Sequence, residues 1–120
     1  KADTLEHSTA GALDTQYVVK GSAKAWSHYN TITNTAKETL NISGITDNGT
    51  GDHTFSISNA FSNANYVVGA FGQEDTGGGA RIISGKGTPT SSQRQVDVNT
   101  LAGAARDLEW HNLTFHGDLA

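Results

Sequence analysis

The chain has 120 residues, a net charge of -4, 35% hydrophobic residues and 17% charged residues. This length fits one domain with a single core. The eight lysines and arginines are dispersed, which argues against the clustered basic face of a nucleic-acid-binding protein. The absence of cysteine excludes disulfides and thiolate metal sites, and no apolar run is long enough for membrane insertion.

Residues 1–23 differ from the rest because their large apolar side chains are few and widely spaced. They cannot form a core of their own, so we expect an extended or partly helical arm that packs on something else, such as a neighbouring subunit. The chain contains no methionine, even at position 1, which predicts a piece of a longer or processed protein. The apolar residues of the arm are Leu5, Leu13, Tyr17, Val18 and Val19.

Short alternating runs between Gly, Ser, Thr and Asn clusters predict strands from residue 24 onward. In the first run, residues 24–29, Trp26 is expected to face the core together with His28. Residues 39–43 place Leu40 and Ile42 inward, and residues 53–58 do the same for Phe55 and Ile57. The turn signal at 47–52, which contains Asn48-Gly49, predicts that these two runs form a hairpin.

The second half of the chain predicts four more strands. Residues 66–71 are apolar on both faces, which indicates a central strand or one covered by a subunit contact. Residues 81–84 and 95–99 are short strands. In the last run, 107–115, a bulge near His111 would bring Leu108, Trp110, Leu113 and Phe115 into one core. Residues 24–120 therefore predict an all-β fold, a jelly-roll-like antiparallel β-sandwich of about seven short strands.

Several blocks of this chain resemble virion structural proteins of tailed bacteriophages and prophages. The resemblance runs from about Asp3 to Tyr66 and returns at the last strand, while residues 71–107 match no pattern of the family. Each block alone is a weak signal, but their order is fairly specific. The blocks are Leu13–Val19, Gly21–Trp26, Ile45–Asp52, Ala64-Asn65-Tyr66 and the ending Gly117-Asp118-Leu119.

In that family such a module closes the C-terminal end of a tail fibre, so the resemblance implies a β-rich homotrimer at a fibre tip. It also implies a virion protein that is assembled in the host cytoplasm and acts outside the cell in host adsorption. The arm, residues 1–23, would pack between subunits or link to the fibre shaft. The partners of the chain would be further copies of itself, the rest of the fibre or tail, and a bacterial surface receptor, expected to be a glycan. The family offers no catalytic residues to transfer.

Candidate interaction residues follow from these expectations. Recognition is expected in loops 72–80 and 86–94, because loops on a rigid sandwich are where binding usually occurs. Subunit contacts are expected from the arm and from the strand at 66–71. The candidate ligand-binding residues are Gln73, Glu74, Asp75, Arg81, Thr90, Ser92 and Arg94. The candidate oligomer-interface residues are Leu5, Leu13, Tyr17, Val18, Val67 and Phe71.

No cofactor, metal site or catalytic centre is predicted. The five histidines, at positions 7, 28, 53, 111 and 116, contain no pair at the i,i+2 or i,i+4 spacing that suits metal ligands, although one histidine from each of three chains could meet on a symmetry axis. The turn 47–52 does not fit a calcium loop. Glu74 and Asp75 are adjacent rather than opposed, unlike the carboxylates of glycosidases. Trp26 and Trp110 are expected in the core rather than as sugar-stacking platforms.

Three other functions remain open. The domain could be a purely structural cap that assembles the fibre and recruits nothing, or a free-standing carbohydrate-binding lectin domain. An enzyme such as a polysaccharide depolymerase is the weakest alternative, because the chain is short and carries no convergent pair of acids.

Overall fold

The protein is an all-β domain with a small N-terminal arm. The computed structural model describes residues 3–74 and 79–120, and ten strands and one helix lie within them. The predicted all-β class and sandwich are confirmed. None of the described helices is long and apolar enough to span a membrane. The elements are β1 (Thr4–His7), β2 (Gly11–Asp14), α1 (Thr15–Gly21), β3 (Ala23–Asn30), β4 (Thr35–Leu40), β5 (Ile42–Gly49), β6 (Asp52–Ile57), β7 (Val67–Gln73), β8 (Arg81–Lys86), β9 (Gln93–Thr100) and β10 (Trp110–His116).

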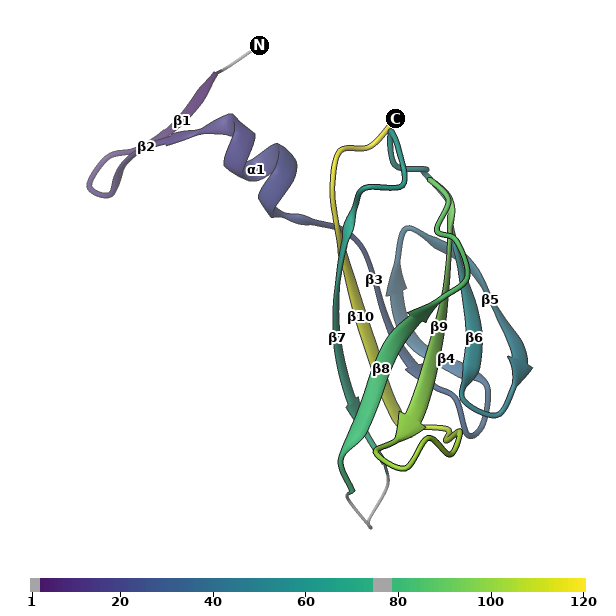
Figure 1. The fold of residues 1–120 in the computed structure, drawn as a ribbon. Helices are drawn as coiled ribbons and strands as arrows, with labels where there is room; N and C mark the ends of the chain where they lie inside the picture. Colours follow the sequence, from purple (N-terminus) through teal and green to yellow (C-terminus); the bar gives the residue numbers. More distant parts are fainter. Residues whose placement is uncertain (1–2, 75–78) are drawn as a thin grey trace.

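Two antiparallel four-stranded sheets form the sandwich (Figure 1). Their strand orders are β4-β3-β10-β7 and β5-β6-β9-β8. The last strand, β10, lies between β3 and β7 and pairs with both. The edge strands β7 and β8 come close to each other on one side of the sandwich.

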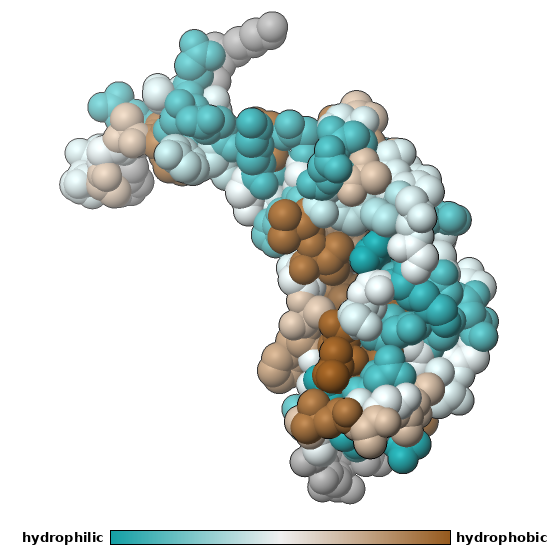
Figure 2. Space-filling view, viewed as in Figure 1, coloured by the Kyte–Doolittle hydropathy of each residue, from teal (hydrophilic) through white to brown (hydrophobic). Residues whose placement is uncertain are grey.

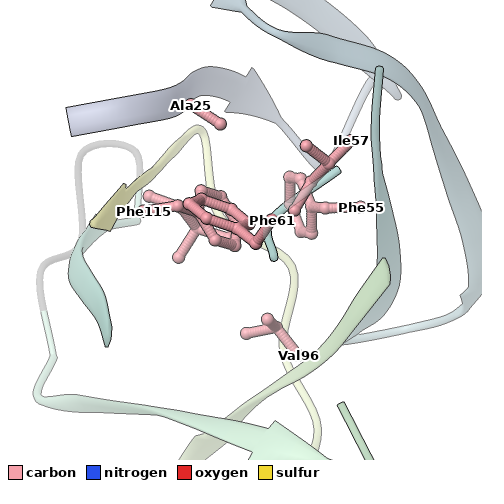
Figure 3. Packing of buried hydrophobic residues seen from close by; sticks show 7 residues of the cluster. Ala25, Phe55, Ile57, Phe61, Val96 and Phe115 are labelled. Carbon is pink, nitrogen blue, oxygen red and sulfur yellow. The ribbon is translucent and has the colours of Figure 1, made fainter. Parts of the chain in front are cut away.

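Aromatic and aliphatic side chains from both sheets meet in one core (Figure 3). Phe55 from β6 and Phe115 from β10 are fully buried, and Phe61 stacks on Tyr66 with ring centroids 4.6 Å apart. Each buried side chain of this size contributes about 2–3 kcal/mol relative to exposure. The alternation of buried residues along β6, β9 and β10 follows the two-residue period of a strand.

The predicted hairpin is confirmed as β5 and β6. The expected single strand at 39–43 is wrong, because Asn41 has a positive φ of 55° and separates β4 from β5. Asn41 joins the two sheets: its amide donates to the Lys24 carbonyl at 3.1 Å and its side-chain oxygen accepts from the Asn59 backbone at 2.7 Å. Ile42 packs on the core, but Leu40 is exposed.

The inward faces of β3 and β10 differ from the predicted ones. In β3, Ala25, Ser27 and Tyr29 are buried, so Trp26 and His28 lie on the outer face. No bulge occurs at His111, because the β3–β10 register shifts only between Phe115 and His116. The Trp110 side chain therefore lies on the outer face of β10, whereas His111, Leu113 and Phe115 lie on the inner face and are buried. Leu108 is buried from the loop that precedes β10.

The arm is a β1–β2 hairpin followed by α1, which confirms a partly helical segment. Asp14 caps the helix by accepting from the Gln16 backbone at 2.9 Å. No residue of α1 is buried, and the arm projects away from the sandwich (Figure 1). His116 Nδ1 lies 2.9 Å from the Gly21 carbonyl oxygen, at the junction between arm and sandwich.

Gly51→Ala should destabilise the fold strongly. Gly51 is buried with a φ of +70°, and a Cβ there would lie 2.5 Å from the Val98 carbonyl oxygen and 2.9 Å from the Arg106 backbone nitrogen. Gly103 has a φ of +87° and nothing within 4 Å of its Cβ position, so Gly103→Ala measures the cost of positive φ alone, about 1–2 kcal/mol. We expect Gly51→Ala to cost about 1–3 kcal/mol more, measured by urea denaturation. Equal costs would show that the close approach has no energetic effect.

Candidate functional site

A cleft opens between the two sheets where the edge strands β7 and β8 approach each other. It has a volume of about 310 Å³. Figure 2 shows apolar residues gathered on the hollow side of the molecule, along β7 and β8 and below the arm. We call this opening the edge cleft. Its lining includes Tyr66, Val68, Ile83, Pro89, Arg94 and Leu113.

Arg94 is the one cationic residue that lines the edge cleft within the described chain. It lies in β9, where it pairs in register with Phe55 of β6. Tyr66 stands beside it and donates a hydrogen bond from its hydroxyl to the Gln93 carbonyl oxygen at 3.0 Å. Burial raises the pKa of Tyr66, and the positive charge of Arg94 partly opposes this rise.

The two loops predicted to carry recognition do not form one site. The β7–β8 loop and the β8–β9 loop lie at opposite ends of β8 (Figure 1), a separation of roughly 20 Å for a six-residue strand. Among the predicted ligand-binding residues, Arg94 lies inside β9 rather than in a loop.

The other predicted ligand-binding residues have mainly local roles. Glu74 forms an ion pair with Arg81 across the base of the β7–β8 loop. Gln73 is exposed at the end of β7, while Asp75 lies outside the described residues. Thr90 and Ser92 belong to the β8–β9 turn, in which Thr90 Oγ1 accepts from the Ser92 backbone at 3.4 Å. Among the members of the predicted set that the structure describes, Arg94 alone lines the edge cleft.

The outer face of the sheet β4-β3-β10-β7 carries apolar and aromatic side chains on β3, β4 and β7 and at the start of β10, on either side of the polar Asn112 and Thr114 of β10. His28 stacks on Trp110 with ring centroids 5.0 Å apart, and the Lys37 ammonium lies 3.8 Å from the Trp110 ring centroid. The predicted interface residues Val67 and Phe71 are 66% and 65% exposed on the same face. We call this surface the outer apolar face. It consists of Trp26, His28, Leu40, Val67, Phe71 and Trp110.

The outer face of the other sheet is mainly polar and internally paired, although Ile82 of β8 is 46% exposed on it. Lys86 Nζ lies 2.6 Å from Asp52 Oδ2 and 3.5 Å from Asp97 Oδ1, and Gln95 donates to Asp52 Oδ1 at 2.7 Å. Asp47 lies instead on the inward side of β5, where it pairs in register with His53 and its Oδ1 lies 3.7 Å from His53 Nε2. It accepts from Asn34 at 2.6 Å and from the Gly49 backbone at 2.8 Å. These hydrogen bonds hold the pKa values of Asp47 and Asp52 below their usual range. Within residues 3–74 and 79–120, no three His, Asp or Glu side chains are grouped to hold a metal ion.

The arm residues named as interface candidates are all exposed. Tyr17 is 63% exposed, and Leu5, Leu13 and Val18 are also largely open to solvent. Their exposure agrees with the expectation that the arm lacks a core of its own.

A histidine pair inside the core was missed by the sequence reasoning. His53 and His111 are almost fully buried, with ring centroids 6.5 Å apart, and His111 stacks on Phe55 at 5.5 Å. His53 Nε2 lies 3.1 Å from Asn34 Oδ1, whereas neither ring nitrogen of His111 has a hydrogen-bond partner among the described residues. The sequence did contain a signal for their burial. His53 lies two residues before Phe55, and His111 lies two residues before Leu113, so each histidine shares a strand face with a core residue.

Comparison with known proteins identifies no relative: no family model, no curated protein and no solved structure matches the chain. The functional argument therefore rests on the edge cleft, the outer apolar face and the arm.

Acid should destabilise the domain through His111. Burial lowers the pKa of His111 to about 4, whereas the unfolded chain protonates near the usual 6.5. The unfolded state binds more protons between these two values, so stability is complete above about pH 6.5 and falls as the pH drops toward 4. The expected loss is about 3 kcal/mol, measured by urea denaturation at several pH values.

The variant His111→Phe is the control for this prediction. A phenyl ring keeps the stacking on Phe55 but cannot be protonated, so more than half of the decline should disappear. Burial also lowers the pKa of His53, which accounts for the remainder. Asp47 and Asp52 protonate below this pH window. An unchanged decline in His111→Phe would contradict the assignment.

Proposed function

We propose that this chain is the non-catalytic distal domain of a bacteriophage tail fibre, which closes the fibre as a homotrimer and attaches the virion to a bacterial surface glycan. The observation that carries this proposal is the set of large apolar side chains that one chain leaves exposed on the arm and on the outer apolar face. The phage assignment itself is an inference from the sequence blocks described above.

The arm supports an assembly role because it cannot be stable by itself. A two-stranded hairpin is marginal in water, and a seven-residue helix is too short to persist without tertiary packing. Because Leu5, Leu13 and Tyr17 remain exposed, the arm needs a partner to cover them.

The outer apolar face supports a second copy of this chain as that partner. The two sheets of the sandwich differ, since one outer face is mainly polar and paired and the other carries Val67, Phe71 and Trp110. Exposed apolar patches of this kind mark interaction sites. Closed symmetric assembly would bring identical copies of this face and of the arm together. A closed assembly adds no further subunits, as the end of a fibre requires.

One observation favours a purely structural cap as the second candidate. The two predicted recognition loops lie at opposite ends of β8, so they cannot contribute to one loop-built receptor site. A cap would assemble normally and bind no polysaccharide. Incubation with an immobilised panel of bacterial surface polysaccharides separates the candidates, since binding supports attachment and complete absence of binding supports the cap.

The purified domain should have the mass of three chains in light scattering behind a sizing column. Phe71→Asp and Val18→Asp should each shift it to a monomer, because a carboxylate cannot be buried at an apolar contact without a partner. Both positions are exposed in the single chain, so folding should be preserved, as measured by circular dichroism.

Leu101→Asp is the matched control. Leu101 is 75% exposed in the loop between β9 and β10, at the end of the sandwich opposite the arm (Figure 1). It is not part of the outer apolar face, so its substitution should leave the trimer intact. A monomeric wild-type domain, or equal dissociation by Leu101→Asp, would contradict the proposed assembly.

A further inference from the structure

We propose that the edge cleft binds the carboxylate of an acidic sugar residue, with Arg94 as its cationic partner. This inference deepens the proposed function and rests on it for the source of the sugar, a glycan of the bacterial surface. The chemistry of the cleft is independent of that source.

The position of Arg94 in β9 is the first argument. Arg94 has the same parity as Val96 and Val98, which are both buried, so all three face the space between the sheets. The strand pattern thus places a cation where an apolar residue is expected. A charged group on the core face has a cost unless it is paired.

Arg94 differs from the neighbouring cations in having no partner. Arg81 pairs with Glu74, and Lys86 pairs with Asp52 and Asp97. Within residues 3–74 and 79–120, no carboxylate forms an ion pair with the Arg94 guanidinium and no acceptor forms a hydrogen bond with it. The charge is therefore available to an anion that enters the cleft.

Gly85 in β8 leaves room for the Arg94 guanidinium because it has no side chain. A Cβ at Gly85 would lie 1.4 Å from Arg94 Nη2 and 2.4 Å from its Cζ. Gly85 does not have the positive φ that would require glycine for backbone reasons. Its role at this position is to leave room, so that the Arg94 side chain lies against the β8 backbone at the wall of the cleft.

The remaining walls indicate what else the ligand carries. Val68, Ile83 and Leu113 give the cleft an apolar lining, with Tyr66 and Pro89 also part of it. A volume of about 310 Å³ is at the small end of ligand sites. It suits one sugar ring, whose C–H face packs on apolar and aromatic surface.

A carboxylate fits this site better than a phosphate. A guanidinium presents two parallel N–H donors that match the two carboxylate oxygens, and its single charge balances one carboxylate. A phosphate monoester carries nearly two charges and three acceptor oxygens, whereas Arg94 is the only cation lining the described cleft. The net charge of -4 provides no long-range attraction, so affinity should be low per site and raised by several copies on one particle.

The test is a nuclear magnetic resonance titration of the full chain with methyl glucuronide and methyl glucoside. The two sugars differ only at C6, which is a carboxylate in the glucuronide and a hydroxymethyl group in the glucoside. Methyl glucuronide should shift the backbone signals of Ser84, Gly85 and Arg94, and it should bind at least tenfold more tightly than methyl glucoside. Equal binding of the two sugars, or tighter binding of glucose 6-phosphate, would overturn the assignment.

Three variants test whether binding of methyl glucuronide depends on Arg94 in the edge cleft. Arg94→Gln should weaken methyl glucuronide at least tenfold. Gly85→Ala should have a similar effect while keeping the charge, because the new methyl group displaces the guanidinium. Arg106→Gln removes the same charge from an exposed loop residue and should change affinity less than twofold. If Arg94→Gln does not fold, Gly85→Ala carries the test, and a loss of binding in Arg106→Gln equal to that in Gly85→Ala would contradict the proposal.

Experiments can contradict host attachment and carboxylate binding in the edge cleft independently of each other. Arg94-dependent binding of methyl glucuronide by a domain that ignores every bacterial polysaccharide would support the cleft chemistry and contradict host attachment. Polysaccharide binding that survives both Arg94→Gln and Gly85→Ala would support attachment and contradict the cleft as its site.

Discussion

The packing of Phe55, Leu113 and Phe115 between the sheets determines which side of every neighbouring strand faces inward. These side chains lie on β6 and β10, the strands that pair with β9 on one side and with β3 and β7 on the other. Because side chains alternate along a strand, one fixed inward residue decides the rest of the face. That constraint places Arg94 in the cleft and puts Trp110 outside, so both proposed interaction surfaces depend on it.

The elements that were predicted correctly are those whose strands and turn are adjacent in sequence. The β5–β6 hairpin followed from alternation and from Asn48-Gly49, since turn chemistry and strand period agreed there. β3 was predicted with the wrong face because both of its sides offer aromatic residues, and the choice between Trp26 and Tyr29 is made by pairing with β10, about 80 residues away in sequence. Similarly, a positive φ at Asn41 is a property of the connection between sheets, which the alternation of Leu40 and Ile42 could not reveal.

The candidate site was only partly predictable for the same reason. Arg94 was named as a loop residue because its neighbours are polar, yet its parity with Val96 and Val98 was visible in the sequence and could have placed it between the sheets. The contribution of Gly85 could not be inferred, because it depends on where a side chain of the adjacent strand lies. The apolar run predicts Val67 and Phe71 as interface residues, and both are exposed because they face outward on the edge strand β7.

The central place of β10 has a consequence for the order of events during synthesis. β3 and β7 become parts of one sheet only when residues 110–116 are available to lie between them, so the sandwich depends on contacts of long sequence separation, which form slowly. The arm is made first and has no core to join while the rest of the chain is still incomplete. Its apolar residues are thus exposed earliest and for longest, when association with other unfinished chains leads to misassembly. In the proposed homotrimer, productive contact between subunits therefore requires that β10 has already been inserted between β3 and β7.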